Sequence, residues 1–321
     1  MKYLSTKFEE YVSQCETYNL HKDKLSVFNS LSKNLKLHNN LILYGPDGVG
    51  KYTQALNYIK KFSPTGLKYE RKINFSSNKK NYLFKVSDIH FEIDMELLGC
   101  NAKQLFNEYY YHITDILISR GPETTGIILC KNFNKIHSEL LDIFYSYMQT
   151  LNHKNIKIIY IFITNSVSFI PNNILERCEI INFKRPTKGC YEKIVTKNNL
   201  KNIKTKDIIN IKNLISNIKI TPIKNTNLIQ KIVNDIINYK TIDFMSMREN
   251  LYNLMVFNLD IHECLFYIIS CLIEKKKLKD EHLEGIFFSL YKFLKLYNNN
   301  YRPIYHLESF IFNLCIVIHG L

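Results

Sequence analysis

One segment constrains the fold of this chain more than any other: a glycine-containing stretch that follows a short apolar run. Residues 41–44 read as a buried strand, the letters from Gly45 to Lys51 fit G-x-x-x-x-G-K, and a helix-like segment follows. A strand, a loop and a helix in this order are the context that a phosphate-binding loop requires. Its glycines let backbone N–H groups surround phosphates, and Lys51 can reach the outer phosphates. The sequence therefore predicts a nucleotide site.

The loop departs from the usual pattern at the position directly after its lysine. A Ser or Thr normally stands there, and its hydroxyl holds Mg²⁺. Tyr52 takes that place, and Thr53 lies one step further along the helix. Bound Mg²⁺ is therefore doubtful, although ATP or ADP is still the expected ligand. The expected nucleotide-binding residues of the loop are Gly45, Pro46, Asp47, Gly48, Val49, Gly50, Lys51, Tyr52 and Thr53.

A second strand of the site lacks the acidic residues that hydrolysis needs. In this class of ATPase, one carboxylate at the end of that strand helps to hold Mg²⁺ and another orients the attacking water. The expected strand, 126–130, is followed by Lys131-Asn132-Phe133-Asn134-Lys135, which contains no carboxylate. Losing a general base alone costs about 10²–10⁴-fold in rate. We therefore expect negligible hydrolysis. Lys131 either replaces Mg²⁺ as a counter-charge for phosphate or points to solvent, and the sequence leaves both open.

The pattern of apolar residues predicts two kinds of architecture. After residues 185–187 the strand signals fade, and amphipathic helices follow. Strands that alternate with helices after a phosphate loop favour a parallel sheet covered on both faces. The expected strands are 41–44, 82–86, 89–93, 126–130, 157–163 and 179–183. The expected later helices are 188–200, 205–218, 224–238, 243–258, 261–276, 281–297 and 303–319.

The composition of the chain indicates which class of partner it binds. A net charge of +14 over 321 residues suggests an anionic partner, with nucleic acid as the first candidate, unless nucleotide bias in the gene explains the many lysines.

The eight cysteines form no C-x-x-C pair, so neither a zinc site nor a disulfide framework is indicated. No uninterrupted apolar stretch reaches the ~20 residues of a membrane span. We expect a soluble, intracellular protein with no bound metal and no membrane association.

Two further polar features follow the expected strand 157–163. Asn165 stands at its carboxyl end, where a polar side chain beside the phosphate loop can sense a terminal phosphate. A short helix then carries Glu176 and Arg177. On local grounds alone this pair is an ordinary solvated one.

The order of these pieces resembles replication factor C, the sliding-clamp loader of the AAA+ class. The loop is similar to the family's G-P-x-G-x-G-K, Thr164-Asn165-Ser166 to its sensor 1 motif, and Glu176-Arg177-Cys178 to its Ser-Arg-Cys motif. Tyr305-His306-Leu307-Glu308 is similar to a motif of the small subunit at the last position of the five-membered ring, which also lacks Ser or Thr after its loop lysine. The resemblance covers about 20–190 and, locally, 300–315.

The resemblance implies an AAA+ domain over 1–186, a helical lid over 187–240 and a helical collar over 241–321. It implies a hetero-pentamer with other clamp-loader subunits that loads a sliding clamp on primer–template DNA during replication. Arg177 would act in trans on a neighbouring subunit's ATP, Asn165 would serve as the sensor and Lys103 would contact a DNA phosphate. The chain itself would be a catalytically inactive subunit, located in the nucleus or in a viral replication compartment.

Departures from the family keep other interpretations open. The family's Tyr-Arg-Pro sequence is absent, Glu176 replaces its serine, and only Lys224 and Lys231 lie near the place of the sensor 2 arginine. Lys103 is equally well read as a solvated lysine on a helix face. One alternative function is an active single-chain P-loop ATPase of DNA replication or repair. Another is a structural scaffold with a vestigial pocket, and a third is an alternative clamp loader for checkpoint or cohesion work.

Overall fold

The chain consists of two compact units, Met1–Ile218 and Lys219–Leu321. The computed structural model describes residues 7–32, 34–77, 80–121, 124–149, 156–197, 226–241, 243–256, 259–297 and 302–321. The expected helix 205–218 and Lys224 lie outside these described residues. The boundary between the units falls inside the segment expected to form the lid, 187–240, so the division into three domains stays a prediction.

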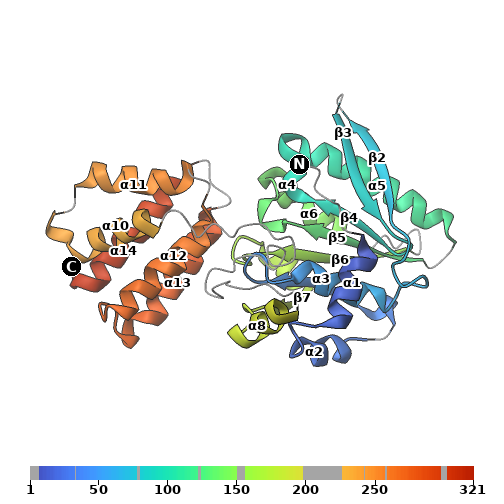
Figure 1. Ribbon diagram of the computed structural model, residues 1–321. Coiled ribbons are helices and arrows are strands. Elements are labelled where there is room, and N and C mark those ends of the chain that lie inside the picture. The colour runs from blue at the N-terminus through green and yellow to red at the C-terminus, as the bar shows by residue number, and fades with distance from the viewer. Residues whose placement is uncertain are drawn as a thin grey trace. The chain divides into compact units, whose positions relative to one another are not determined.

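The first unit is built on one seven-stranded sheet with the order β2-β3-β4-β5-β6-β1-β7. Strands β4, β5, β6, β1 and β7 run parallel, whereas β2 and β3 form an antiparallel hairpin that joins β4 (Figure 1). The sheet is therefore mixed rather than wholly parallel, and β2 was not predicted. The strands are β1 (Asn40–Tyr44), β2 (Arg71–Ser77), β3 (Lys80–Val86), β4 (His90–Asp94), β5 (Thr125–Lys131), β6 (Lys157–Thr164) and β7 (Cys178–Asn182).

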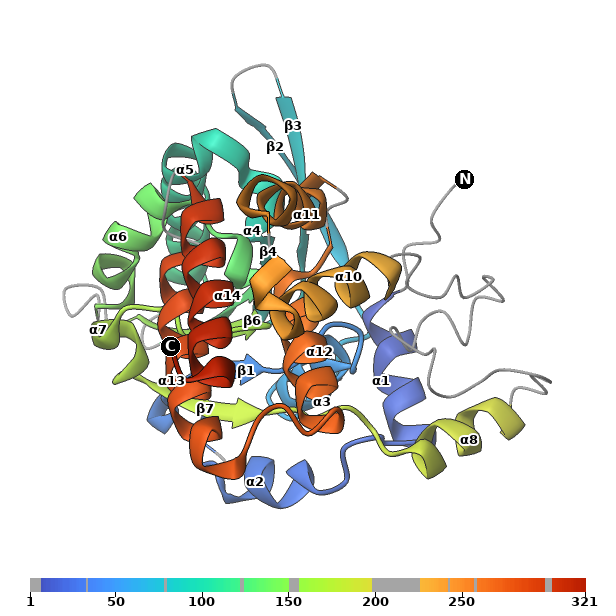
Figure 2. The same cartoon turned by 90° about the vertical axis from the view of Figure 1, so that its left-hand side faces the viewer.

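Helices cover both faces of this sheet, as predicted. Successive side chains of a strand point to opposite faces, so Leu41 and Leu43 of β1 join one apolar core while Ile42 joins the other. The first core is closed by α1 (Phe8–Thr17), α2 (Lys24–Ser30) and α3 (Lys51–Lys60). The second is closed by α4 (Met95–Leu98), α5 (Ala102–Ser119) and α6 (Ser138–Met148), as Figures 1 and 2 show. The remaining helices of this unit are α7 (Asn172–Leu175) and α8 (Lys188–Lys197).

The second unit is helical, which confirms the prediction of a helical region after the α/β domain. Asp260 accepts hydrogen bonds from the N–H groups of His262 and Glu263 and so caps α12, while Pro303 begins α14 and Gly320 ends it in a left-handed conformation. The helices are α10 (Thr226–Ile237), α11 (Phe244–Val256), α12 (Ile261–Glu274), α13 (Asp280–Tyr297) and α14 (Pro303–His319). None of the helices in the described residues is long and apolar enough to cross a membrane.

The Tyr-His-Leu-Glu motif lies in α14, where its glutamate forms an ion pair. Glu308 is buried, and its Oε2 accepts a hydrogen bond of 2.9 Å from an Nη atom of Arg248 in α11. The Nε atom of Arg248 also donates to Oε1 of Glu308. This bidentate pair ties α11 to α14, because a planar guanidinium matches the two oxygens of a carboxylate.

Gly45 lies where β1 ends, against the segment that follows β7. A Cβ atom added there would lie 2.1 Å from the carbonyl oxygen of Phe183, whose N–H donates to the Tyr44 carbonyl at 2.7 Å. A backbone oxygen cannot rotate away as a flexible side chain can. We therefore expect Gly45→Ala to lower the free energy of unfolding by about 3 kcal/mol, measured by denaturant unfolding.

Gly285 offers the matched control for this substitution. It lies within α13, and apart from its chain neighbours and the nearby backbone of that helix no heavy atom stands within 4 Å of an added Cβ. Alanine there should raise the stability of the second unit by about 0.5–1 kcal/mol, because glycine weakens a helix interior. Equal unfolding of the Gly45→Ala variant and the natural protein would show that the close approach at Phe183 relaxes without cost.

Candidate nucleotide site

The loop between β1 and α3 has the backbone form of a phosphate cradle. Gly48 and Gly50 have φ angles of 71° and 97°, in the left-handed region that other residues avoid. Gly50 is the N-cap of α3, whose first N–H groups lack partners within the helix and carry positive partial charge. The Val49 side chain is buried and anchors the loop. This is the strand, loop and helix arrangement that the motif predicts.

The amino-terminal segment supports the loop from outside. His21 is buried, and its Nε2 atom lies 2.8 Å from the carbonyl oxygen of Val49. Burial lowers the pKa of His21, although the Val49 carbonyl opposes that effect. The neutral imidazole can still donate its Nε2–H to the carbonyl, so His21 fixes the loop without adding charge to it.

Lys51 and Asn165 meet at the centre of the site. The Lys51 side chain is buried, and its Nζ donates to the Pro46 carbonyl at 2.8 Å and to Oδ1 of Asn165 at 2.9 Å. Nζ also donates to the Gly45 carbonyl. Asn165 in turn donates from Nδ2 to Oδ2 of Asp47 at 2.7 Å. The structure thus brings together the loop lysine and the residue expected to sense a terminal phosphate, because β6 pairs directly with β1.

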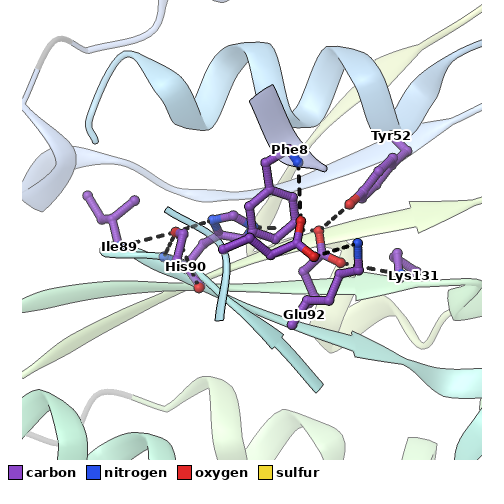
Figure 3. A network of polar contacts seen from close by, with 9 residues as sticks. Phe8, Tyr52, Ile89, His90, Glu92 and Lys131 are labelled. Carbon is purple, nitrogen blue, oxygen red and sulfur yellow. Dashed lines mark hydrogen bonds and ion pairs between the residues drawn. The ribbon is translucent and has the colours of Figure 1, made fainter. Parts of the chain in front are cut away.

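Tyr52 is bound to β4 (Figure 3). Its hydroxyl donates to Oε1 of Glu92 at 2.6 Å, and its ring packs edge-on against Tyr11 with the ring centres 4.9 Å apart. Lys131 lies on the same carboxylate, with Nζ 3.4 Å from Oε2 of Glu92 and 5.3 Å from the centre of the Tyr52 ring. Lys131 is therefore paired with the carboxylate of Glu92 inside the protein. This position differs from both sequence-based alternatives, in which Lys131 either balanced phosphate charge or pointed to solvent. Thr53, the next residue, is half-buried on α3.

Glu92 is the residue of this site that the sequence did not reveal. It is 2% exposed, and its Oε1 also lies 3.5 Å from Nε2 of the buried His90. Burial opposes ionisation, but His90, Lys131 and the Tyr52 hydroxyl outweigh it and hold the pKa of Glu92 below its ordinary value. Burial and Glu92 together raise the pKa of Tyr52. At neutral pH the pair is a carboxylate and a neutral phenol, and Glu92 carries a fixed negative charge inside the sheet.

The end of β5 holds an amide where a magnesium site would place an acid. Asn132 has a φ of 50°, and its Nδ2 donates to Oδ1 of Asp94 at 2.9 Å. The same Asp94 oxygen accepts the Glu96 N–H at 3.2 Å and so caps α4. Mg²⁺ favours octahedral oxygen ligands, whereas the two carboxylates nearby, Glu92 and Asp94, are already paired with Lys131 and with Asn132. Within the described ranges, no cluster of three His, Cys, Asp or Glu could hold a metal ion. The residues do not fit Mg²⁺.

Arg177 and the loop lie at opposite ends of two neighbouring parallel strands. Arg177 precedes β7, whose first residue Cys178 pairs with Asn40 at the start of β1, whereas the loop follows Tyr44 at the end of β1. A five-residue strand spans about 13 Å. The exposed guanidinium lies 5.5 Å from the centre of the Tyr145 ring and borders a cavity of about 580 Å³. Arg177 therefore cannot act on the loop of its own chain.

The two other lysines singled out by sequence lie on helices. Lys103 is exposed in the first turn of α5 and lines a hollow of about 460 Å³ with Asn107 and Glu139. Lys231 is exposed on α10 in the second unit. Neither contributes to the loop contacts described above.

No protein-family model matches the sequence, and no curated protein matches it. Among solved structures, the chain is similar to the RuvB Holliday junction branch migration motor of Thermotoga maritima. That match has 15% identity and a TM-score of 0.37, and it covers 79% of this chain and 72% of the other. Two variants of the same RuvB match at 15% identity over 79% of this chain and 72% and 73% of theirs, with TM-scores of 0.35 and 0.36. At that identity the similarity concerns the fold alone, and nothing about function follows from it.

Proposed function

We propose that this chain is a non-hydrolysing, nucleotide-binding subunit of an AAA+ sliding-clamp loader related to replication factor C. The observation that carries the proposal is the placement of Arg177, which is exposed before the start of β7, while the phosphate loop follows the opposite end of the neighbouring parallel strand β1. In this proposal Arg177 serves a nucleotide held by another subunit, because it lies too far from the loop of its own chain. The end of β5, where Lys131 and Asn132 stand in place of acids, supports the view that the chain's own site does not hydrolyse ATP.

In this proposal the chain is one member of a hetero-pentamer with other clamp-loader subunits. ATP or ADP occupies the loop around Lys51, and hydrolysis takes place at neighbouring sites. Arg177 neutralises charge that develops on a neighbour's γ-phosphate. Lys103 is a contact to a phosphate of primer–template DNA, which gives affinity without sequence preference. The complex loads the sliding clamp in the nucleus or in a viral replication compartment.

The test is mass analysis of the native complex purified from its own source, with released nucleotide identified in the same sample. The proposal expects four related AAA+ chains, a ring-shaped clamp and nucleotide bound to this chain. A lone protein that turns over ATP would instead establish a single-chain P-loop ATPase of replication or repair. A complex in which this chain carries no nucleotide would favour a scaffold with a vestigial pocket.

A further inference from the structure

We infer that the loop binds nucleotide without a divalent cation, because Tyr52, Glu92 and Lys131 form an internal cluster in place of the protein ligands that such a cation needs. The inference rests on the proposed nucleotide binding. It adds that groups of the protein, and not a metal ion, balance the negative charge of the phosphates. Figure 3 shows the cluster, in which β4 supplies the carboxylate, α3 the phenol and β5 the ammonium.

The first step concerns the hydroxyl that follows the loop lysine. A Ser or Thr carries its hydroxyl one bond from Cβ, at the first turn of the helix. The Tyr52 hydroxyl stands at the far end of an aromatic ring and donates its proton to Glu92 at 2.6 Å. Tyr52 is half-buried beside that carboxylate, and burial and Glu92 raise the pKa of its hydroxyl, so it stays protonated. A neutral phenol bound in this way cannot take the place of the hydroxyl ligand.

The second step concerns charge at the end of β5. The ammonium of Lys131 lies 3.4 Å from Glu92, whose side chain is 2% exposed. Lys131 therefore already supplies Glu92 with a positive counter-charge from within the protein, beside an Oε2 atom that accepts no hydrogen bond among the described residues. Lys131 would also repel a divalent ion that approached the same carboxylate, since like charges in a partly buried site are weakly screened. Another acid of β4, Asp94, is engaged by the Asn132 amide and the Glu96 N–H.

The third step follows from what remains to balance the phosphates. Positive potential at the loop comes from Lys51, from the loop N–H groups and from the amino terminus of α3. None of these depends on a metal ion. Nucleotide affinity should then be the same whether the ligand is free or complexed with Mg²⁺.

The experiment is a titration of the full chain with fluorescent ADP and ATP, in excess MgCl₂ and in excess EDTA. We expect the two Kd values to agree within about threefold. Tightening by Mg²⁺ of about tenfold or more would overturn the inference and leave the proposed nucleotide binding intact. Absence of binding in both buffers would overturn the proposed nucleotide binding itself, so the two failures are distinguishable.

Variants test whether the cluster is the cause. Tyr52→Thr combined with Lys131→Asp supplies a short hydroxyl and a carboxylate, and should create a tightening by Mg²⁺ of about tenfold. Circular dichroism checks that this variant folds. A folded double variant that binds nucleotide but ignores Mg²⁺ would overturn the role assigned to the cluster. Lys135→Asp makes the same charge change at a nearby exposed position and should leave the response to Mg²⁺ unchanged.

Tyr52→Phe is the conservative variant, because it keeps the ring and removes only the hydroxyl. If the hydroxyl is no metal ligand, this variant should bind nucleotide equally in MgCl₂ and EDTA, as the natural chain does. A loss of affinity confined to the MgCl₂ titration would show that the Tyr52 hydroxyl does hold the ion, and would overturn the inference even if the double variant did not fold.

Discussion

Replacing Arg177 by alanine is expected to abolish most ATP hydrolysis at the neighbouring site of the assembled complex, while this chain's own nucleotide binding stays unchanged. An arginine that reaches into a neighbour's phosphoryl-transfer site contributes about 10³–10⁵ in rate. The loop of the same chain should not respond, because Arg177 lies at the other end of β1. The measurements are DNA-stimulated ATPase activity of the reconstituted complex and, separately, nucleotide affinity of the variant chain.

Two control variants sharpen this experiment. Arg177→Lys keeps the positive charge but loses the planar fork, so it should restore only part of the rate. Arg71→Ala removes an exposed arginine from β2 and should leave hydrolysis unchanged. Full DNA-stimulated activity in a complex that contains Arg177→Ala would show that the assignment in trans is wrong.

Replacing Lys51 by methionine is expected to weaken nucleotide binding by about 100-fold. The Lys51 ammonium is buried against the Pro46 carbonyl and Asn165, from which it can turn to phosphate oxygens. Hydrogen bonds to charged groups contribute about 1.5–3 kcal/mol each, and about 2.7 kcal/mol corresponds to that loss of affinity. Equilibrium titration with fluorescent ADP measures the change, and denaturant unfolding shows whether the empty loop has also lost stability.

Lys135→Met is the matched control, since it removes the same charge from an exposed site after β5. It should bind nucleotide as the natural chain does. Unchanged affinity in Lys51→Met would mean that the Lys51 ammonium does not contact the phosphates and that the nucleotide is not bound by this loop.

Local patterns in the sequence were enough to predict most of the fold. The apolar runs located β1 and β3 to β7, and the helical periodicity located α10 to α14 within a few residues. Strand β2 was not predicted, because its sequence Arg-Lys-Ile-Asn-Phe-Ser-Ser has few apolar residues. Its pairing with β3 holds it in the sheet. Pairing of this kind depends on the partner strand, so the sequence of the strand itself does not reveal it.

The candidate site was predictable only where its residues are adjacent in sequence. The loop and Tyr52 were visible at once, and Asn165 followed from the strand before it. Glu92 was not predictable, because it stands in an apolar run. Its role depends on its contacts with Tyr52, which is 40 positions away in sequence, and with Lys131 on another strand. The pairing of β4 with β5 and the packing of α3 on the sheet bring these three groups together.

The placement of the phosphate loop and Arg177 at opposite ends of the same strands has a consequence for symmetry. In the proposed assembly, the surface that receives nucleotide and the surface that offers Arg177 lie at opposite ends of the strands. One partner cannot cover both surfaces at once, so copies or relatives would join through them head to tail. Such a contact is heterologous and cannot produce a closed pair related by a twofold axis. Repetition of the contact either closes into a ring or continues as a helical filament. The rotation between neighbours, rather than the chemistry of either surface, then decides how many subunits complete a turn.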